Sequence, residues 1–281
     1  MNAGLESACL DTARELTNLF ADAVPPFSLS TLAEYFGVSE VRERPLDRDA
    51  RLVFESGRLL IEVNSLFPSV RRRLSIAHEI GHLIIDRCSP KGDSNWGHGD
   101  AATESLCNRL AGQLLAPDWA VRKHFAGITG LADWRDPIRC STILAAASKF
   151  GISVDAAASR IFCELGLAPG VAAIIWRHTE NTARSDSDRA LRIASAWHSG
   201  QGRVYIPRNK TAPLDSVIRK ASEQSGVFSS IEDLSFGTLR GRFQVEAVGF
   251  GPNSLKTRTV EARSVLSLAS PLCGEPVSTT N

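Results

Sequence analysis

The sequence has no marked excess of charge of either sign, which excludes a protein that coats nucleic acid or an anionic membrane through charge alone. Its 281 residues include 32 Lys and Arg against 31 Asp and Glu, a formal net charge of +1. Proteins that bind such polyanions without specificity are usually strongly basic. Any contact with nucleic acid must therefore be local.

Long apolar runs are also missing. No stretch reaches the roughly 20 apolar residues that a membrane-spanning helix needs, and the first residues contain no basic leader followed by an apolar core. Internal repeats and low-complexity tracts are absent as well. We therefore expect a cytoplasmic protein without membrane contacts.

Closely spaced cysteines are missing too. The six cysteines occur singly, at positions 9, 88, 107, 140, 163 and 273, and none forms a Cys-x-x-Cys pair. This distribution is untypical of a disulfide framework in a chain of this length. We expect reduced thiols.

The residues that are present predict an α+β protein with two domains. Apolar residues make up 43% of the chain, enough for one or two ordinary cores. Apolar residues at helical spacing predict helices at about 5–22, 30–36, 70–86, 101–115, 141–150 and 155–165. Two β-rich runs around Ser56-Gly57 predict a hairpin at 51–63. Later short runs at 171–176, 203–206, 243–250 and 257–268, with a helix near 214–225, predict a β-rich region.

A change of composition at Ala168-Pro169-Gly170 sets the expected domain boundary. We expect residues 1–168 to form an α-rich domain with a small antiparallel sheet, of which the last part, about 136–168, is helical. We expect residues 171–272 to form a smaller β-rich accessory domain, followed by a flexible tail at 273–281.

The helix expected at 70–86 contains the motif His-Glu-Ile-Gly-His at 78–82. Side chains four residues apart lie on one helix face about 6 Å from each other, so His78 and His82 can bind a single metal ion. Glu79 lies next to the first ligand, where its carboxylate can face a metal-bound water. The flanking residues are apolar, and a buried pair of histidines needs a partner. We therefore interpret the motif as a metal site.

A hydrolytic zinc site needs three protein ligands and one open position. A longer form of the motif supplies a third histidine six residues after the second. This chain has Cys88 at that position, so it does not contain the longer motif. Glu104, on the next expected helix, is our candidate, because the small residues on its helix face allow two helices to approach closely. Two alternatives stay open: Glu104 is only a favourable acid at a helix N-terminus, or His98 is the ligand or a donor to the oxyanion.

The sequence around these positions resembles the ImmA/IrrE family of metallopeptidases. The similar segments are Ser-Ile-Ala-His-Glu-Ile-Gly-His at 75–82 and Glu-Ser-Leu-Cys-Asn-Arg-Leu-Ala-Gly-Gln-Leu-Leu-Ala-Pro at 104–117, within a match over about 5–167. The chain departs from the family pattern at Cys107, where the family has Ala, at Leu110, where it has Phe, and at Ala116, where it has Met. These apolar changes leave the ligand positions intact.

The resemblance implies a zinc-dependent endopeptidase domain of the zincin type at 1–168. It implies that His78, His82 and Glu104 bind the metal and that Glu79 is the catalytic base, which takes a proton from water and passes it to the leaving amine. Zinc would lower the pKa of the bound water to about 7 and polarise the scissile carbonyl; manganese is the alternative metal.

The resemblance also implies a partner. Members of the family often cleave a helix-turn-helix repressor or an antitoxin-like protein encoded nearby, and so derepress stress, phage or mobile-element genes. The domain at 171–272 would then sense a signal or dock the substrate. The sequence has only Tyr35 and Tyr205 as tyrosine donors to an oxyanion, and neither is near the motif.

Two other functions are compatible with the sequence. Residues 141–165 have the helix, glycine turn and helix typical of a helix-turn-helix, so a DNA-binding regulator with a structural metal site is the alternative. Its second helix has few long polar side chains besides Arg160 for reading bases, which favours a packing role. The third hypothesis is a catalytically silent scaffold whose zinc has a fourth protein ligand, Cys88 or Cys107.

Overall fold

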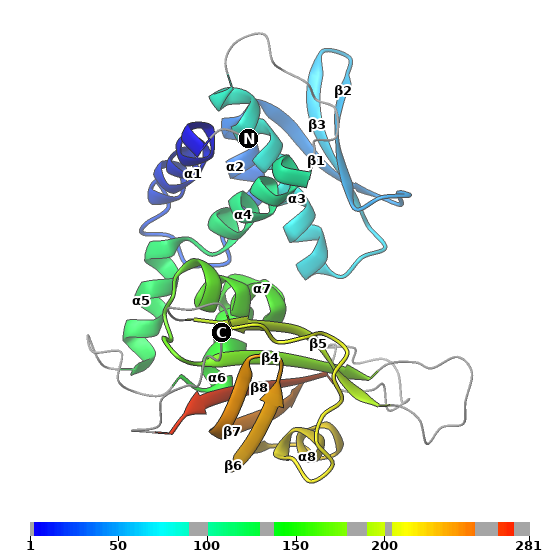
Figure 1. Ribbon diagram of the computed structural model, residues 1–281. Helices are drawn as coiled ribbons and strands as arrows, with labels where there is room; N and C mark the ends of the chain where they lie inside the picture. Colours follow the sequence, from blue (N-terminus) through cyan, green and yellow to red (C-terminus); the bar gives the residue numbers. More distant parts are fainter. Residues whose placement is uncertain are drawn as a thin grey trace. The chain divides into compact units, whose positions relative to one another are not determined.

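The computed structural model describes residues 3–89, 101–129, 138–178, 190–199, 204–250 and 264–272 (Figure 1). These residues confirm the predicted α+β class, with an N-terminal helical region and a C-terminal β-rich region. The contacts within the chain define two compact units. The first comprises Met1–Ile128 and Ala145–Ala156, and the second comprises Thr129–Leu144 and Ala157–Asn281. The domain boundary near residue 168 stays a prediction.

The first unit combines helices with a small sheet. Its elements are α1 (Ala3–Asn18), α2 (Leu29–Tyr35), β1 (Val38–Arg44), β2 (Ala50–Glu55), β3 (Arg58–Asn64), α3 (Ser69–Cys88), α4 (Ala101–Leu115) and α5 (Asp118–Thr129). Two further helices, α6 (Cys140–Phe150) and α7 (Val154–Ser159), are divided between the two units. The helices predicted at 70–86 and 101–115 correspond to α3 and α4. These two helices carry the candidate metal ligands.

The small sheet has the strand order β1-β3-β2. The predicted hairpin is confirmed: β2 and β3 are antiparallel and joined by Ser56 and Gly57, whose φ angles of 51° and 76° fit a type I′ turn. The sheet is mixed rather than purely antiparallel, because β1 pairs with β3 in the parallel direction. After β1 the chain first forms β2 and then returns as β3, which lies between β1 and β2. Strand β2 therefore occupies an edge of the sheet.

The contact between α3 and α4 is unusually close at Gly81. A Cβ atom at this position would lie 3.2 Å from both the Cα and the backbone oxygen of Cys107. The apolar side chains on either side of this contact are fully buried: Ala77, Ile80 and Ile84 on α3, and Leu110, Ala111 and Leu114 on α4. The absence of a side chain at Gly81 therefore sets how near the two helices can lie.

Some helix boundaries differ from the sequence-based expectations for local reasons. The helix predicted at 30–36 begins at Leu29 and is capped by Ser28, whose Oγ accepts a hydrogen bond from the backbone N–H of Thr31. The sequence analysis missed α5, because a proline such as Pro117 usually marks the end of a helix. In the structure the carbonyl of Pro117 accepts a hydrogen bond from the backbone N–H of Val121, and this bond begins α5. The helix predicted at 155–165 consists of α7 and a short π-helix, Arg160–Glu164.

The second unit contains a five-stranded antiparallel sheet in the order β5-β4-β8-β7-β6. Its strands are β4 (Ala172–His178), β5 (Leu191–His198), β6 (Val227–Phe236), β7 (Leu239–Phe250) and β8 (Ser264–Pro271), and α8 (Val217–Glu223) packs on it. The strands predicted at 171–176 and 243–250 are confirmed, whereas the prediction for 203–206 is wrong at 204–206, which are not in a strand. The sequence analysis missed β5 and β6, and the tail at 273–281 lies outside the described residues.

None of the helices in the described ranges combines the length and apolar character needed to cross a membrane.

The close helix contact yields a testable prediction. We expect Gly81→Ala to lower the free energy of unfolding by about 1–2 kcal/mol, because overpacking against the Cys107 backbone outweighs the better helix propensity of Ala. Gly127 of α5 is the matched control, since a Cβ there meets no atom within 4 Å. Gly127→Ala should raise that free energy by about 0.5–1 kcal/mol. Chemical denaturation followed by circular dichroism measures both, and equal effects of the two variants would contradict the contact.

Candidate metal centre

Helix α3 presents the two histidines of the motif on one face. The ring centroids of His78 and His82 lie 5.0 Å apart, with an angle of 71° between the ring planes. The i, i+4 spacing produces this pairing, as expected from helix geometry. Both side chains are mostly covered, with 20% and 23% of their surface exposed. The pair therefore lies at the edge of the core and still reaches solvent.

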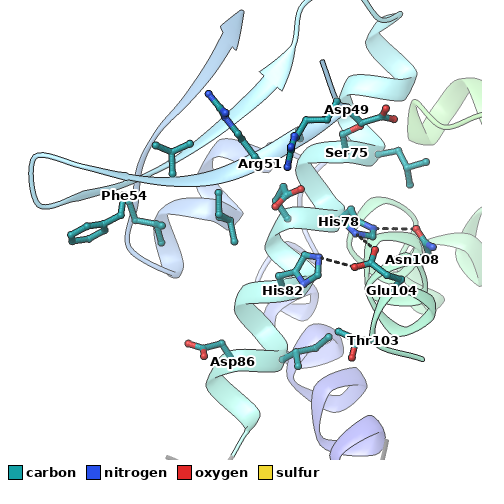
Figure 2. A pocket seen from close by; sticks show the side chains of 18 of the residues that line it. Asp49, Arg51, Phe54, Ser75, His78, His82, Asp86, Thr103, Glu104 and Asn108 are labelled. Carbon is teal, nitrogen blue, oxygen red and sulfur yellow. Dashed lines mark hydrogen bonds and ion pairs between the residues drawn. The ribbon is translucent and has the colours of Figure 1, made fainter. Parts of the chain in front are cut away.

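The carboxylate of Glu104 lies against both imidazoles (Figure 2). Its Oε2 is 3.1 Å from His78 Nε2, and its Oε1 is 3.7 Å from His82 Nε2. Donor atoms of a tetrahedral zinc site with nitrogen and oxygen ligands are separated by about 3.3 Å. The two distances are close to this value, so the three side chains fit a divalent metal ion.

Asn108 holds the first histidine from its other side. Its Oδ1 lies 3.1 Å from His78 Nδ1, and Figure 2 shows this contact beside the one with Glu104. An amide oxygen only accepts, so this contact places the ring proton on Nδ1 and leaves the lone pair of Nε2 for a metal. The sequence analysis assigned no role to Asn108. The feature of the sequence that could have indicated this role is the position of Asn108 one helical turn after Glu104.

Cys107 brings a sulfur atom to the same place. The ligand atoms of His78, His82 and Cys107 all lie within 4.8 Å of one another. The thiol is fully buried, and burial, assisted by the negative charges of Glu104 and Glu79, raises its pKa to about 12. A nearby cation would have the opposite effect and favour the thiolate.

Cys88, the other cysteine considered as a fourth ligand, lies elsewhere. Its Sγ is 3.4 Å from Thr12 Oγ1 of α1, and its thiol contacts that of Cys9. Neither Cys88 nor Glu104 belongs to the group of ligand atoms within 4.8 Å of one another, although Glu104 contacts both histidines directly. The structure therefore separates the two cysteines: Cys107 is beside the histidines, and Cys88 faces α1.

The histidines open into a cleft of about 910 Å³. Its walls come from β2, α3 and α4, and the residues that line it include Glu79 as well as His78, His82 and Glu104. A volume of this size is typical of a ligand-binding cleft. The arrangement thus brings the expected base and the expected ligands to a common cavity.

Strand β2 forms one wall of the cleft with an open edge. The backbone N–H of Asn64 donates to the carbonyl of Asp49, and in an antiparallel pair such bonded residues alternate. Leu52 and Phe54 therefore direct their backbone N–H and C=O groups away from β3. Among the described residues no strand pairs with β2 on that side.

Two charged residues of the cleft are engaged with neighbours. Arg51 Nη2 lies 2.7 Å from Glu62, whose pKa is held below its usual value by hydrogen bonds from Arg51 and then Arg44. Asp49 lies 2.8 Å from Arg71 Nε. These pairs stabilise the sheet and its junction with α3, and they occupy side chains that line the cleft.

Comparisons with known proteins give a family match for part of the chain. The model of the Peptidase_M78 family, described as the IrrE N-terminal-like domain, matches residues 33–162. The match covers slightly less than half of the chain. The predicted resemblance to ImmA/IrrE proteins is thereby confirmed, and the matched segment contains the motif at 78–82 as well as Glu104.

A solved structure resembles nearly the whole chain. It is a Mycobacterium tuberculosis transcriptional regulator, with a TM-score of 0.55 and 16% sequence identity, and the match covers 96% of this chain and 76% of that chain. At this identity the likeness concerns the fold alone. No curated protein matches the chain.

Of the other oxyanion candidates, Tyr35 is the one that the described residues place in the same unit as the histidines. His98 lies outside the described residues. Tyr35 packs edge-on against Phe36, with the guanidinium of Arg87 over its ring, and is not part of the cleft wall. Tyr205 belongs to the second unit. The oxyanion donor therefore has no assignment among the described tyrosines.

The contact between Asn108 and His78 yields a prediction for the IrrE-like domain. We expect Asn108→Ala to weaken zinc binding by about 10–100-fold, because His78 loses the partner that orients its ring. Asn108→Asp keeps an acceptor oxygen and should retain most of the affinity. Competition with a chromophoric chelator measures both constants. Equal zinc affinity of the wild type and the alanine variant would show that the contact does not position the ligand.

Proposed function

We propose that the IrrE-like domain is a zinc-dependent endopeptidase, with His78, His82 and Glu104 as metal ligands and Glu79 as the general base. The observation that carries the proposal is the contact of one carboxylate, that of Glu104, with the Nε2 atoms of both histidines at 3.1 and 3.7 Å. A pair of neutral histidines and a carboxylate is a common ligand set of hydrolytic zinc sites. The match of residues 33–162 to the model of a peptidase family supports the same reaction.

The chain's own side chains have separate roles in this proposal. A bound zinc ion supplies Lewis acidity for water and for the scissile carbonyl. Glu79, in the cleft, accepts a proton from the attacking water and delivers it to the amine that leaves. Asn108 keeps the proton of His78 on Nδ1, so that Nε2 stays available.

The open edge of β2 supports a peptide rather than a small molecule as substrate. An extended peptide can add to a free strand edge through backbone hydrogen bonds, which do not depend on its sequence. Leu52 and Phe54 present such groups along the wall of the cleft. The side chain of Phe54 is also 76% exposed, which gives the wall an apolar surface for a substrate side chain.

We further propose that the substrate is a helix-turn-helix repressor or an antitoxin-like protein encoded nearby, cleaved in the cytoplasm to derepress stress, phage or mobile-element genes. The support is the family and the fold shared with a transcriptional regulator. The cysteines of the described residues are free thiols, in keeping with a reducing compartment. The domain proposed at 171–272 would sense a signal or dock the substrate.

Direct DNA binding is the second candidate, and the fold likeness to a transcriptional regulator favours it. The segment 141–165 contributes little to it. Arg160, the basic residue expected to read bases, has a side chain only 7% exposed, and its Nη1 lies 2.5 Å from Glu164. A salt-dependent, sequence-selective shift of duplex DNA by the metal-free protein would support this alternative.

Replacing the base separates a peptidase from a silent scaffold. We expect Glu79→Gln to bind zinc as the wild type does and to lose at least about 100-fold in cleavage rate, because the amide cannot accept the proton. Elemental analysis measures the metal. Mass spectrometry of new protein N-termini in cells that express either form measures cleavage. If the variant produces the same N-termini as the wild type, the proposal is wrong.

The strand edge can be tested with prolines. Leu52→Pro removes an N–H that points away from β3, so the sheet should remain intact while a bound peptide loses a hydrogen bond. We expect kcat/KM for a peptide that spans the mapped cleavage site to fall by about 3–10-fold relative to Leu52→Ala. Val53→Pro is the control for damage to the sheet, since it removes an N–H bonded to β3. Unchanged kcat/KM in Leu52→Pro would exclude pairing at this position.

A further inference from the structure

The thiol of Cys107 approaches the histidines from the buried side of the site. Its side chain is fully inaccessible to solvent, while its sulfur and the ligand nitrogens of His78 and His82 form a group in which every separation is below 4.8 Å. In the described part of the chain, these three residues are the group of potential metal ligands that meets this limit. Neither the family match nor the fold likeness assigns it a role.

The packing of α3 and α4 holds this position in place. The Cα and the backbone oxygen of Cys107 lie 3.2 Å from the place of a Cβ at Gly81, the residue that directly precedes His82. Buried apolar side chains surround the contact on both helices. Cys107 is therefore fixed next to the histidine pair by the helix backbones, and it does not depend on a flexible loop.

We propose that Cys107 is a sulfur ligand of the metal bound by His78 and His82, and that it increases the preference of this site for zinc over manganese. The inference rests on the metal site of the proposed function. Donor atoms of zinc bound by nitrogen and sulfur are about 3.6 Å apart, and the ligand atoms of these three residues lie within 4.8 Å of one another. Coordination replaces the S–H bond by a sulfur–metal bond and releases the proton to solvent, so it needs no oxidant or other reactant.

The selectivity follows from the chemistry of the donors. Carboxylate and water oxygens suit manganese, whereas thiolate is a soft donor that favours zinc and copper(I). A site of two histidines and Glu104 would already prefer zinc to manganese, as nitrogen and oxygen sites in general do. The sulfur of Cys107 would increase this preference.

Cobalt(II) provides a direct probe of the sulfur ligand. Titration of the full-length reduced protein with cobalt(II) should produce a sulfur-to-cobalt charge-transfer absorption in the near ultraviolet. The band should disappear in Cys107→Ala and persist in Cys163→Ser, which changes an exposed cysteine of the second unit. Cys107→Ser preserves the size of the side chain, and circular dichroism verifies the fold of each variant. A band that survives both substitutions at position 107 would overturn the proposal.

Metal competition tests the selectivity. The ratio of manganese to zinc dissociation constants should fall by at least about 10-fold in Cys107→Ala, because zinc loses a ligand that contributes little to manganese binding. An unchanged ratio would refute the selectivity. Failure of the proposed function would give a different result. Either the wild-type protein would bind neither zinc nor cobalt(II), or the double variant His78→Ala/His82→Ala would bind both metals as tightly as the wild type does. Cobalt bound through the histidines without the sulfur band would leave the peptidase site intact and remove only the role of Cys107.

Discussion

The close contact between α3 and α4 at Gly81 is the constraint on which the candidate site depends. The histidines belong to one helix, and Glu104, Cys107 and Asn108 belong to the other, so the distance between the helix axes sets how far the histidines lie from these three residues. Glycine allows the backbone of Cys107 to approach to the limit of van der Waals contact. A larger residue would separate the imidazoles from the carboxylate even if each side chain kept its own rotamer. The same contact between the two helices therefore determines both the packing of the core and the arrangement of the site.

The small sheet complements the helix pair by providing backbone groups. Because β1 pairs with the opposite side of β3, β2 is left at the edge that borders the cleft. The two-residue turn at Ser56 and Gly57 determines the register of the hairpin, and this register decides which residues point away from β3. The helices thus position side chains for proton transfer and metal binding, while the edge of β2 can hold an extended chain beside them.

The parts of the structure that follow from local periodicity could be predicted from the sequence. Helix α3 and the pairing of His78 with His82 follow from a 3.6-residue repeat, and the hairpin follows from its turn. The candidate role of Glu104 required the helical face it shares with small residues. The contact of Asn108 with His78 and the approach of Cys107 depend on how two helices face each other, which spacing along one chain does not encode. Strand β6 was missed because its exposed positions alternate with partly buried ones and give a weak apolar signal.

The exposure of the donors explains how a sulfur ligand can coexist with an open catalytic position. The side chains of His78, His82 and Glu104 are 20%, 23% and 38% exposed, so these donors border the cleft. Cys107 is fully buried and reaches the histidines from the core. A structural zinc site closes its coordination with protein atoms, whereas a hydrolytic site keeps a position for water, and zinc accepts a fifth donor during reaction. Sulfur from the core side therefore does not compete with water or substrate from the side of β2. In the proposed site, a metal held by Cys107 from the core side would remain accessible to a peptide in the cleft.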